Sequence, residues 1–238
     1  MPYNPDFVYD PPMYPLLPIV HADDDLLVLN KVSGLLSVRG RALAHQDSLE
    51  SRVQRVYPTA TIIHRLDMAT SGLIVMPLNM DTHRALSRQF AERQTRKAYL
   101  ARVYGEVTQS QGSIDRPLIV DWPNRPKQKV DEASGKPSLT HFQKVSGDGT
   151  SSLMLLQPVT GRSHQLRVHM LELGHPILGD RLYGEPYARY QAPRLQLHAW
   201  QLGFFHPGQQ QWVQFRSDAP FASNDELEHA ATLYMANN

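Results

Sequence analysis

Short apolar runs, each bounded by turn-forming residues, recur along this chain of 238 residues without a regular alternation of strand and helix. The runs predict strands at 26–30, 61–63, 73–76, 95–107, 136–145, 151–159, 195–201 and 211–215. Helices are predicted at 47–57, 81–94, 164–173 and 225–235, with Asp81 and Ser163 as the N-caps of the second and third. This grouping favours an α+β fold, with a mixed, largely antiparallel sheet and flanking helices, over a doubly wound parallel sheet.

Proline and turn residues indicate how the chain is divided. The first 17 residues contain five prolines, which a regular helix does not tolerate, so we expect an extended arm at 1–17. Turns are expected at 23–25 and 146–149, the second of which closes a hairpin, and an irregular loop at 179–193. No repeat or low-complexity linker interrupts 18–220, which we expect to be the main domain, followed by an acidic helix at 221–238.

The composition excludes several kinds of site. Without cysteine there is no disulfide, thiol nucleophile or thiolate metal site. No apolar run approaches the ~20 residues of a membrane span, and no basic segment followed by an apolar one begins the chain, so we expect a cytoplasmic protein. The net charge is only +1, but all 24 Lys and Arg precede Ser217, and four of the 23 acids follow it. Residues 1–217 therefore carry +5, which is weak support for a polyanionic partner.

A polar loop between the apolar runs at 61–63 and 73–76 holds the most reactive set of side chains. It contains His64, Arg65 and Asp67, followed by a Thr-Ser-Gly turn at 70–72. A short polar loop fed by a rigid strand can hold a reactive group still while keeping it accessible. From spacing alone, a simpler interpretation is that Asp67 forms a turn or pairs with Arg65.

The sequence His-Arg-Leu-Asp at 64–67, followed by Thr-Ser-Gly-Leu at 70–73, resembles the signature loop of the RluA family of RNA pseudouridine synthases. The resemblance continues in the same order through 31–37, 97–99, 121–129, 160–170 and 174–180, and spans about 18–220. It implies the pseudouridine synthase catalytic fold, with no separate N-terminal RNA-binding domain, no metal and no cofactor. Val32 stands where the family pattern usually has proline after Lys31, so this loop lacks that constraint on its backbone.

The resemblance assigns three catalytic residues. Asp67 matches the family's nucleophile, and a covalent adduct divides one hard substitution into easier steps. Arg167 matches a basic residue expected to pair with Asp67 and keep it ionised when RNA excludes water. Tyr99 matches the active-site tyrosine, whose ring can stack on uracil and whose phenol can transfer a proton. Without the resemblance, Tyr99 reads as a core residue and Arg167 as a surface residue. The residues do not decide whether the base or the ribose is attacked.

A uridine in folded RNA must be swung out of its stack before Asp67 can reach it. Arg65 resembles the residue proposed to fill the vacated space, with a salt bridge to Asp67 as the alternative. His64 either contacts phosphate or holds the loop, and Leu197 is either an apolar wall beside the base or an ordinary core residue. The candidates for phosphate contacts are Lys31, Arg39, Arg41, Arg125, Lys127, Lys129 and Arg162. The resemblance implies substrates in a 23S rRNA hairpin and in tRNA anticodon loops; it implies no protein partner, and we expect a monomer.

Other classes fit the residues less well. A retaining glycosidase needs two carboxylates about 5 Å apart, and the signature loop has one. The histidines at 164, 169, 175 and 198 lack the spacing that places two imidazoles on one helix face, and the Gly-x-Ser-x-Gly of a serine hydrolase is absent. Two alternatives stay open: an RNA-binding or chaperone protein on the same scaffold, and a synthase that acts on only one RNA class.

Overall fold

The computed structural model describes residues 8–236, and the first seven residues of the predicted arm (1–17) and the last two residues of the chain lie outside this range. The chain forms two compact units, and each is built from separate segments. The described residues of the first unit are 8–97 and 198–217, and those of the second are 98–197 and 218–236. Two of the three divisions fall inside strands β4 (Arg96–Tyr104) and β10 (Leu197–His206), where the sequence has no linker signal, and the third falls after residue 217. No helix within 8–236 is long and apolar enough to cross a bilayer.

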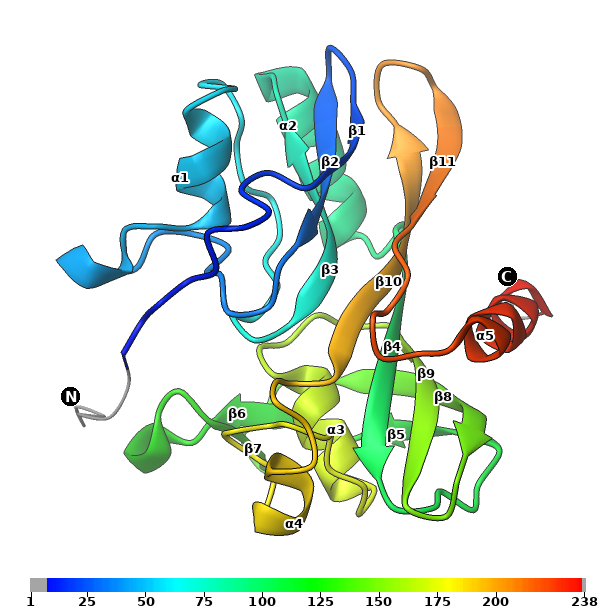
Figure 1. The fold of residues 1–238 in the computed structure, drawn as a ribbon. Helices are drawn as coiled ribbons and strands as arrows, with labels where there is room; N and C mark the ends of the chain where they lie inside the picture. Colours follow the sequence, from blue (N-terminus) through cyan, green and yellow to red (C-terminus); the bar gives the residue numbers. More distant parts are fainter. Residues whose placement is uncertain (1–7, 237–238) are drawn as a thin grey trace. The chain divides into compact units, whose positions relative to one another are not determined.

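The first unit has a sheet between two helices (Figure 1). Its strands are β1 (Ile19–Ala22), β2 (Leu26–Lys31), β3 (Ser71–Pro77), β10 and β11 (Gln211–Arg216), in that order, and only the β3–β10 pair is parallel. One face of β2 and β3 packs on α1 (Leu49–Gln54), and the other packs on α2 (Met80–Ala91). Because both faces are covered, β3 is buried along its whole length, as its apolar sequence predicts.

The second unit contains a run of four antiparallel strands. Its strands follow the order β4, β9 (Ser151–Pro158), β8 (Leu139–Gly147) and β5 (Gln111–Asp115), so the predicted β8–β9 hairpin is confirmed. A separate ribbon joins β6 (Leu118–Val120) and β7 (Gln128–Val130) through a short turn, η2 (Trp122–Asn124). The helices are α3 (Gln165–Glu172), α4 (Pro186–Arg189) and α5 (Asn224–Ala236). The predicted terminal helix is α5, which is held to β4 by an ion pair from Arg102 to Glu226 at 2.7 Å.

Three local predictions were wrong. The run 61–63 is not a strand, because only the Thr61 N–H bonds to β3 (2.9 Å, to Pro77 O), while its two isoleucines pack against different cores. Helix α2 is capped by Asn79, whose Oδ1 accepts from the N–H of Thr82 at 2.9 Å, and not by Asp81. Helix α3 follows His164, whose backbone is left-handed (φ 57°), and Ser163 does not cap it.

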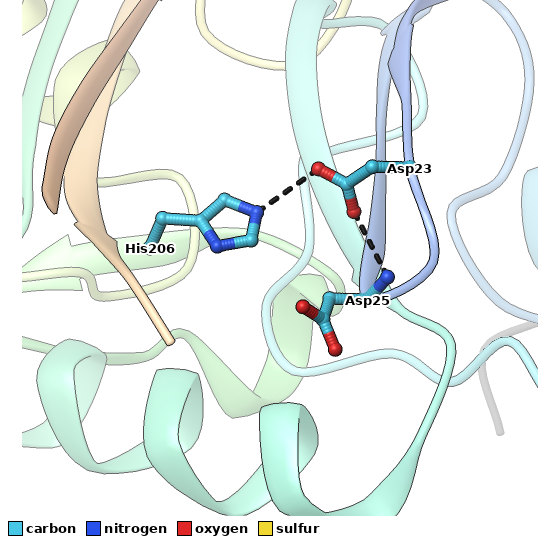
Figure 2. Close-up of side chains that lie close together, drawn as sticks. All are labelled: Asp23, Asp25 and His206. Atoms are coloured by element: carbon cyan, nitrogen blue, oxygen red, sulfur yellow. Dashed lines mark hydrogen bonds and ion pairs between the residues drawn. The ribbon is translucent and has the colours of Figure 1, made fainter. Parts of the chain in front are cut away.

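The predicted turn at 23–25 is confirmed, and Asp23 organises it (Figure 2). One carboxylate oxygen accepts the N–H groups of Asp25 and Leu26, both at 2.9 Å. The other lies 2.7 Å from Nε2 of His21 and 3.0 Å from Nε2 of His206, at the end of β10. Burial raises the pKa of Asp23, but these hydrogen bonds outweigh it and bring the pKa to about 2. The turn between β1 and β2 is therefore fixed to the last residue of β10 in the same sheet.

Candidate active site

The signature loop of the first unit is held on both sides of Asp67 by the segment 31–37. The Ser37 hydroxyl donates to Leu66 O at 2.7 Å and accepts from Leu66 N at 3.1 Å. Beyond Asp67, the Gly34 N–H donates to Met68 O at 2.8 Å and the Ser33 hydroxyl to the next carbonyl at 2.6 Å. Asp67 itself is half-buried. The backbone around Asp67 is thus fixed, while the residue itself keeps part of its surface exposed.

Lys31 belongs to the same clamp and was expected to contact phosphate. Its side chain is fully buried, and its ammonium donates to the carbonyl oxygens of Val32, Leu35 and Met68 at 3.0, 2.7 and 3.0 Å. Three carbonyl acceptors replace the water that a buried ammonium would otherwise need. The position of Lys31 favours a role in shaping the loop and leaves no path from its ammonium to an RNA phosphate.

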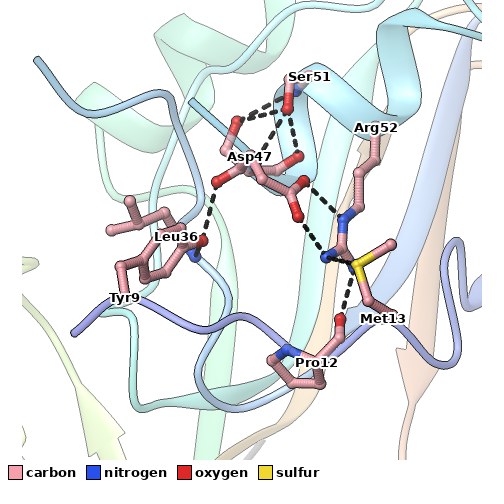
Figure 3. Close-up of polar contacts among 8 residues, drawn as sticks. Tyr9, Pro12, Met13, Leu36, Asp47, Ser51 and Arg52 are labelled. Carbon is pink, nitrogen blue, oxygen red and sulfur yellow. Dashed lines mark hydrogen bonds and ion pairs between the residues drawn. The ribbon is translucent and has the colours of Figure 1, made fainter. Parts of the chain in front are cut away.

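The described part of the N-terminal arm braces this clamp (Figure 3). The hydroxyl of Tyr9 accepts from the N–H of Leu36 at 3.0 Å and donates to Asp47 O at 2.8 Å. Arg52, which is 1% exposed, binds both carboxylate oxygens of Asp47 at 2.8 and 2.7 Å and donates to Pro12 O at 2.9 Å. The arm therefore lies on the loop that holds Asp67, a connection that its sequence did not predict.

The far end of the signature loop is fixed by β10. The Ser71 hydroxyl lies 2.8 Å from Nδ1 of His198, whose Nε2 donates to Ser217 O at 2.9 Å. Gly72 has φ +113°, and a Cβ there would lie 2.3 Å from the carbonyl oxygen of Ala199. Only glycine fits, because the parallel β10 backbone occupies the space of a side chain.

His64 and Arg65 are adjacent but lie in different surroundings. The imidazole Nε2 of His64 accepts the N–H of Val75 at 3.0 Å, and the ring stacks on Phe90 at 4.4 Å. Burial, with a smaller effect from the charge of Lys97, lowers the pKa of His64 to about 3, so the ring is neutral at pH 7. These contacts favour the loop-holding alternative for His64. Arg65 is exposed and forms no hydrogen bond or ion pair with any residue in 8–236, so the alternative salt bridge to Asp67 is not formed.

In the second unit, the guanidinium of Arg167 is buried against Asp180. Its Nε and Nη2 donate to the two carboxylate oxygens at 2.8 and 2.6 Å, and both side chains are at most 4% exposed. Burial raises the pKa of Asp180, but the hydrogen bonds and charge of Arg167, with the N–H groups of Leu182 and Tyr183, lower it further and leave it below its usual range. Arg167 also lies 5.0 Å above the ring of Tyr183. Asp180 thus fixes the orientation of Arg167.

Buried polar contacts also fix the start of α3. The side-chain oxygen of Gln165 accepts from the Thr160 hydroxyl at 2.8 Å and from Arg162 N at 3.0 Å, while its amide nitrogen donates to Leu139 O at 3.0 Å. His169 is fully buried between the hydroxyl of Thr140 and a carbonyl oxygen. The sequence block that resembles the family is therefore largely the scaffold of Arg167.

The remaining expected contacts lie at different depths. Tyr99 is half-buried on β4, opposite Leu156 of β9, and Leu197 is buried at the start of β10. Arg41, Lys129 and Arg162 are exposed, whereas Arg125 and Lys127 are half-buried. Arg125 lies 3.8 Å above the exposed indole of Trp122, at the turn of the β6–β7 ribbon. The N–H of Gln128 in that ribbon donates to the Tyr183 hydroxyl at 2.7 Å, which ties the ribbon to the scaffold of Arg167.

Comparisons with known proteins agree with this arrangement. Residues 25–172 match the family described as RNA pseudouridylate synthase. The chain belongs to this family of RNA pseudouridine synthases. Over 215 residues the synthase is 54% identical to the dual-specificity RNA pseudouridine synthase RluA of Escherichia coli strain K12, covering 90% of this chain and 98% of that one. The RluA of Vibrio parahaemolyticus is 53% identical over 204 residues, covering 84% and 82%.

Solved structures agree with the fold of the synthase. Human RNA Pseudouridylate Synthase Domain Containing 1 matches with a TM-score of 0.73 and 30% identity, covering 97% of this chain and 98% of that one. Human RNA Pseudouridylate Synthase Domain Containing 4 matches with a TM-score of 0.71 and 25% identity, covering 90% and 92%. The predicted fold class and enzyme class are confirmed: the synthase is an isomerase that acts on RNA.

Sequence reasoning missed the residues that hold the expected catalytic ones. Asp180 lies in a block that resembles the family, but its spacing of 13 residues from Arg167 gives no sign of contact. Tyr9 and Ser37 are separated from their partners by 27 and 29 residues. The place of Asp180 in a block that resembles the family was the only available signal, because side-chain contacts at such separations depend on the tertiary fold.

Proposed function

We propose that Asp67 is the nucleophile of uridine isomerisation in this synthase. The observation that carries the proposal is the clamp around it: hydrogen bonds from 33–37 fix the backbone on both sides, while Asp67 itself is only half-buried. Groups held in this way need little reorganisation when substrate arrives. In the reaction, the N1–C1′ bond breaks, a C5–C1′ bond forms, the proton at C5 leaves and N1 gains one. A carboxylate that adds to the substrate and later departs meets the requirement for a covalent intermediate.

We infer that Arg167 and Tyr99 complete the chemistry. Asp180 accepts hydrogen bonds from Nε and Nη2 of Arg167 and so fixes the plane of the guanidinium. The position of the positive charge is therefore set before substrate binds. An arginine fixed in this way can keep a nearby carboxylate ionised in a water-poor site. Tyr99 offers a ring that can stack on uracil and a phenol that can carry a proton to or from it.

For the RNA, we propose stem-loops in 23S rRNA and in the tRNA anticodon arm, with the synthase acting as a monomer in the cytoplasm. The name of the Escherichia coli relative, dual-specificity RNA pseudouridine synthase, supports more than one RNA substrate. Arg65 is exposed beside the nucleophile and has no partner in 8–236, so its guanidinium is available to replace a flipped base in the stack. The exposed cations Arg41, Lys129 and Arg162 can bind phosphates, which supply affinity with little sequence choice.

Tritium release from transcripts labelled at uracil C5 tests the assignment. Wild-type protein should release label from a tRNA transcript and from a 23S rRNA hairpin, and Asp67→Asn should release none above background. Asp225→Asn, at an exposed acid on α5, is the matched control and should behave as wild type. Full activity of Asp67→Asn would refute the role of Asp67. Release from only one transcript would restrict the proposed substrates to that RNA class.

A further inference from the structure

Two cations, Arg93 and Lys97, lie near the His64–Phe90 pair beside the signature loop. Phe90 stacks on His64, and its carbonyl lies 3.4 Å from the N–H of Arg93, which follows α2 with a left-handed backbone (φ 59°). This sharp turn returns the chain to β4, where Lys97 lies close enough for its charge to act on His64. Arg65 comes directly after His64. The fold of this unit therefore brings Arg93 and Lys97 close to one aromatic stack, and Arg65 follows that stack directly in the sequence.

These cations lack the acidic partners that charged groups usually have when they gather. Within residues 8–236, none of the three side chains forms a hydrogen bond or an ion pair. Glu92, the acid that directly precedes Arg93, uses its carboxylate to accept from the side-chain amide of Gln94 at 2.9 Å. By contrast, Arg84 on the same helix pairs with Asp81 at 3.2 Å in the usual manner of an exposed helix face.

Lys97 is the most unusual of the three, because it is half-buried. An ammonium that loses water without gaining an acceptor destabilises the folded protein. Burial, with the added repulsion of Arg93, lowers the pKa of Lys97. Charged groups kept at such a cost are typical of binding sites, where the ligand supplies the missing counter-charge.

We propose that Arg93 and Lys97 form an anion site that binds a backbone phosphate of the RNA next to the target uridine. The proposal rests on the proposed function, since it places the phosphate beside the loop that carries Asp67. A phosphodiester supplies the acceptors that both side chains lack, and a base leaving its stack near Arg65 brings its own backbone with it. Neither residue belongs to the phosphate contacts that the sequence predicted.

The salt dependence of RNA binding tests the site directly. Affinity for a synthetic tRNA anticodon stem-loop is measured between about 0.05 and about 0.5 M salt. All proteins carry Asp67→Asn, which prevents turnover during the measurement. Lys97→Gln and Arg93→Gln should each reduce the slope of log affinity against log salt by about 0.7–0.9, which corresponds to roughly 5- to 8-fold weaker binding at 0.1 M salt. Arg84→Gln is the matched control and should leave the slope unchanged. An unchanged slope in Lys97→Gln would overturn the proposal.

Stability gives a second readout that separates binding from folding. Lys97→Met keeps the length of the side chain and removes the uncompensated charge, so its unfolding midpoint should equal or exceed that of wild type while its affinity falls. A clear loss of stability in Lys97→Met would instead assign the ammonium an internal structural role. If wild type itself releases no label, the proposed function fails, whereas the phosphate site is still judged by the salt slope.

Discussion

Replacing Asp180 with alanine would leave the guanidinium of Arg167 buried without its carboxylate. The pair is joined at 2.8 and 2.6 Å, and Asp180 also accepts the N–H groups of Leu182 and Tyr183 at 2.8 and 3.1 Å. Removing one member of a buried ion pair typically costs about 3–5 kcal/mol of unfolding free energy, because the other charge stays desolvated. For a chain of this size, that loss lowers the unfolding midpoint by roughly 6–20 °C.

A double-mutant cycle separates the scaffold from the chemistry. Arg167→Met and Asp180→Leu should each destabilise the protein, but the double variant should recover to within about 2 kcal/mol of wild type, since apolar side chains of similar volume can replace a buried pair. Turnover should stay lost in the double variant, because Arg167 is absent. Urea unfolding and tritium release on the same preparations provide the two measurements. A cost below about 1 kcal/mol for Asp180→Ala, or turnover by the double variant, would refute the reasoning.

Three further predictions concern the first unit. The folded protein keeps His64 neutral because its pKa falls to about 3, so the unfolding free energy of wild type should decrease as the pH drops below about 6.5. His64→Gln keeps a hydrogen-bond acceptor that does not titrate. Its unfolding free energy, measured in urea, should therefore change less between about pH 5 and 6.5. Gly72→Ala should lower the yield of folded protein or its stability by more than about 2 kcal/mol, since the added Cβ would meet Ala199 O at 2.3 Å; a neutral effect by calorimetry would contradict the close approach. Tyr9→Phe removes the hydroxyl that binds Leu36, and it should lower kcat several-fold with KM nearly unchanged; equal kcat would show that the arm does not brace the loop.

The sequence by itself determined the elements whose local signals agree. The apolar run at 73–76 is a buried strand, the Ser-Gly-Asp-Gly turn closes its hairpin, and the acidic terminal segment is a helix. Family resemblance also located the signature loop and the blocks around Arg167. Short-range patterns succeed there because each strand or turn depends on neighbouring residues. The strand predicted at 61–63 was wrong, because β-branched residues form a strand only where a partner strand is available.

Only the tertiary structure decided which polar groups meet. Lys31 looked like a phosphate contact, but the fold buries its ammonium against three carbonyl oxygens. Asp180 was a member of a matching block without a role, and the fold makes it the partner of Arg167. The sequence did not predict Lys97 as a binding residue, yet it is half-buried and close enough to His64 for its charge to affect that ring. Burial and pairing depend on segments far apart in the chain. A local sequence pattern therefore cannot distinguish a lysine that holds a loop, such as Lys31, from a lysine whose ammonium has no acceptor within the protein.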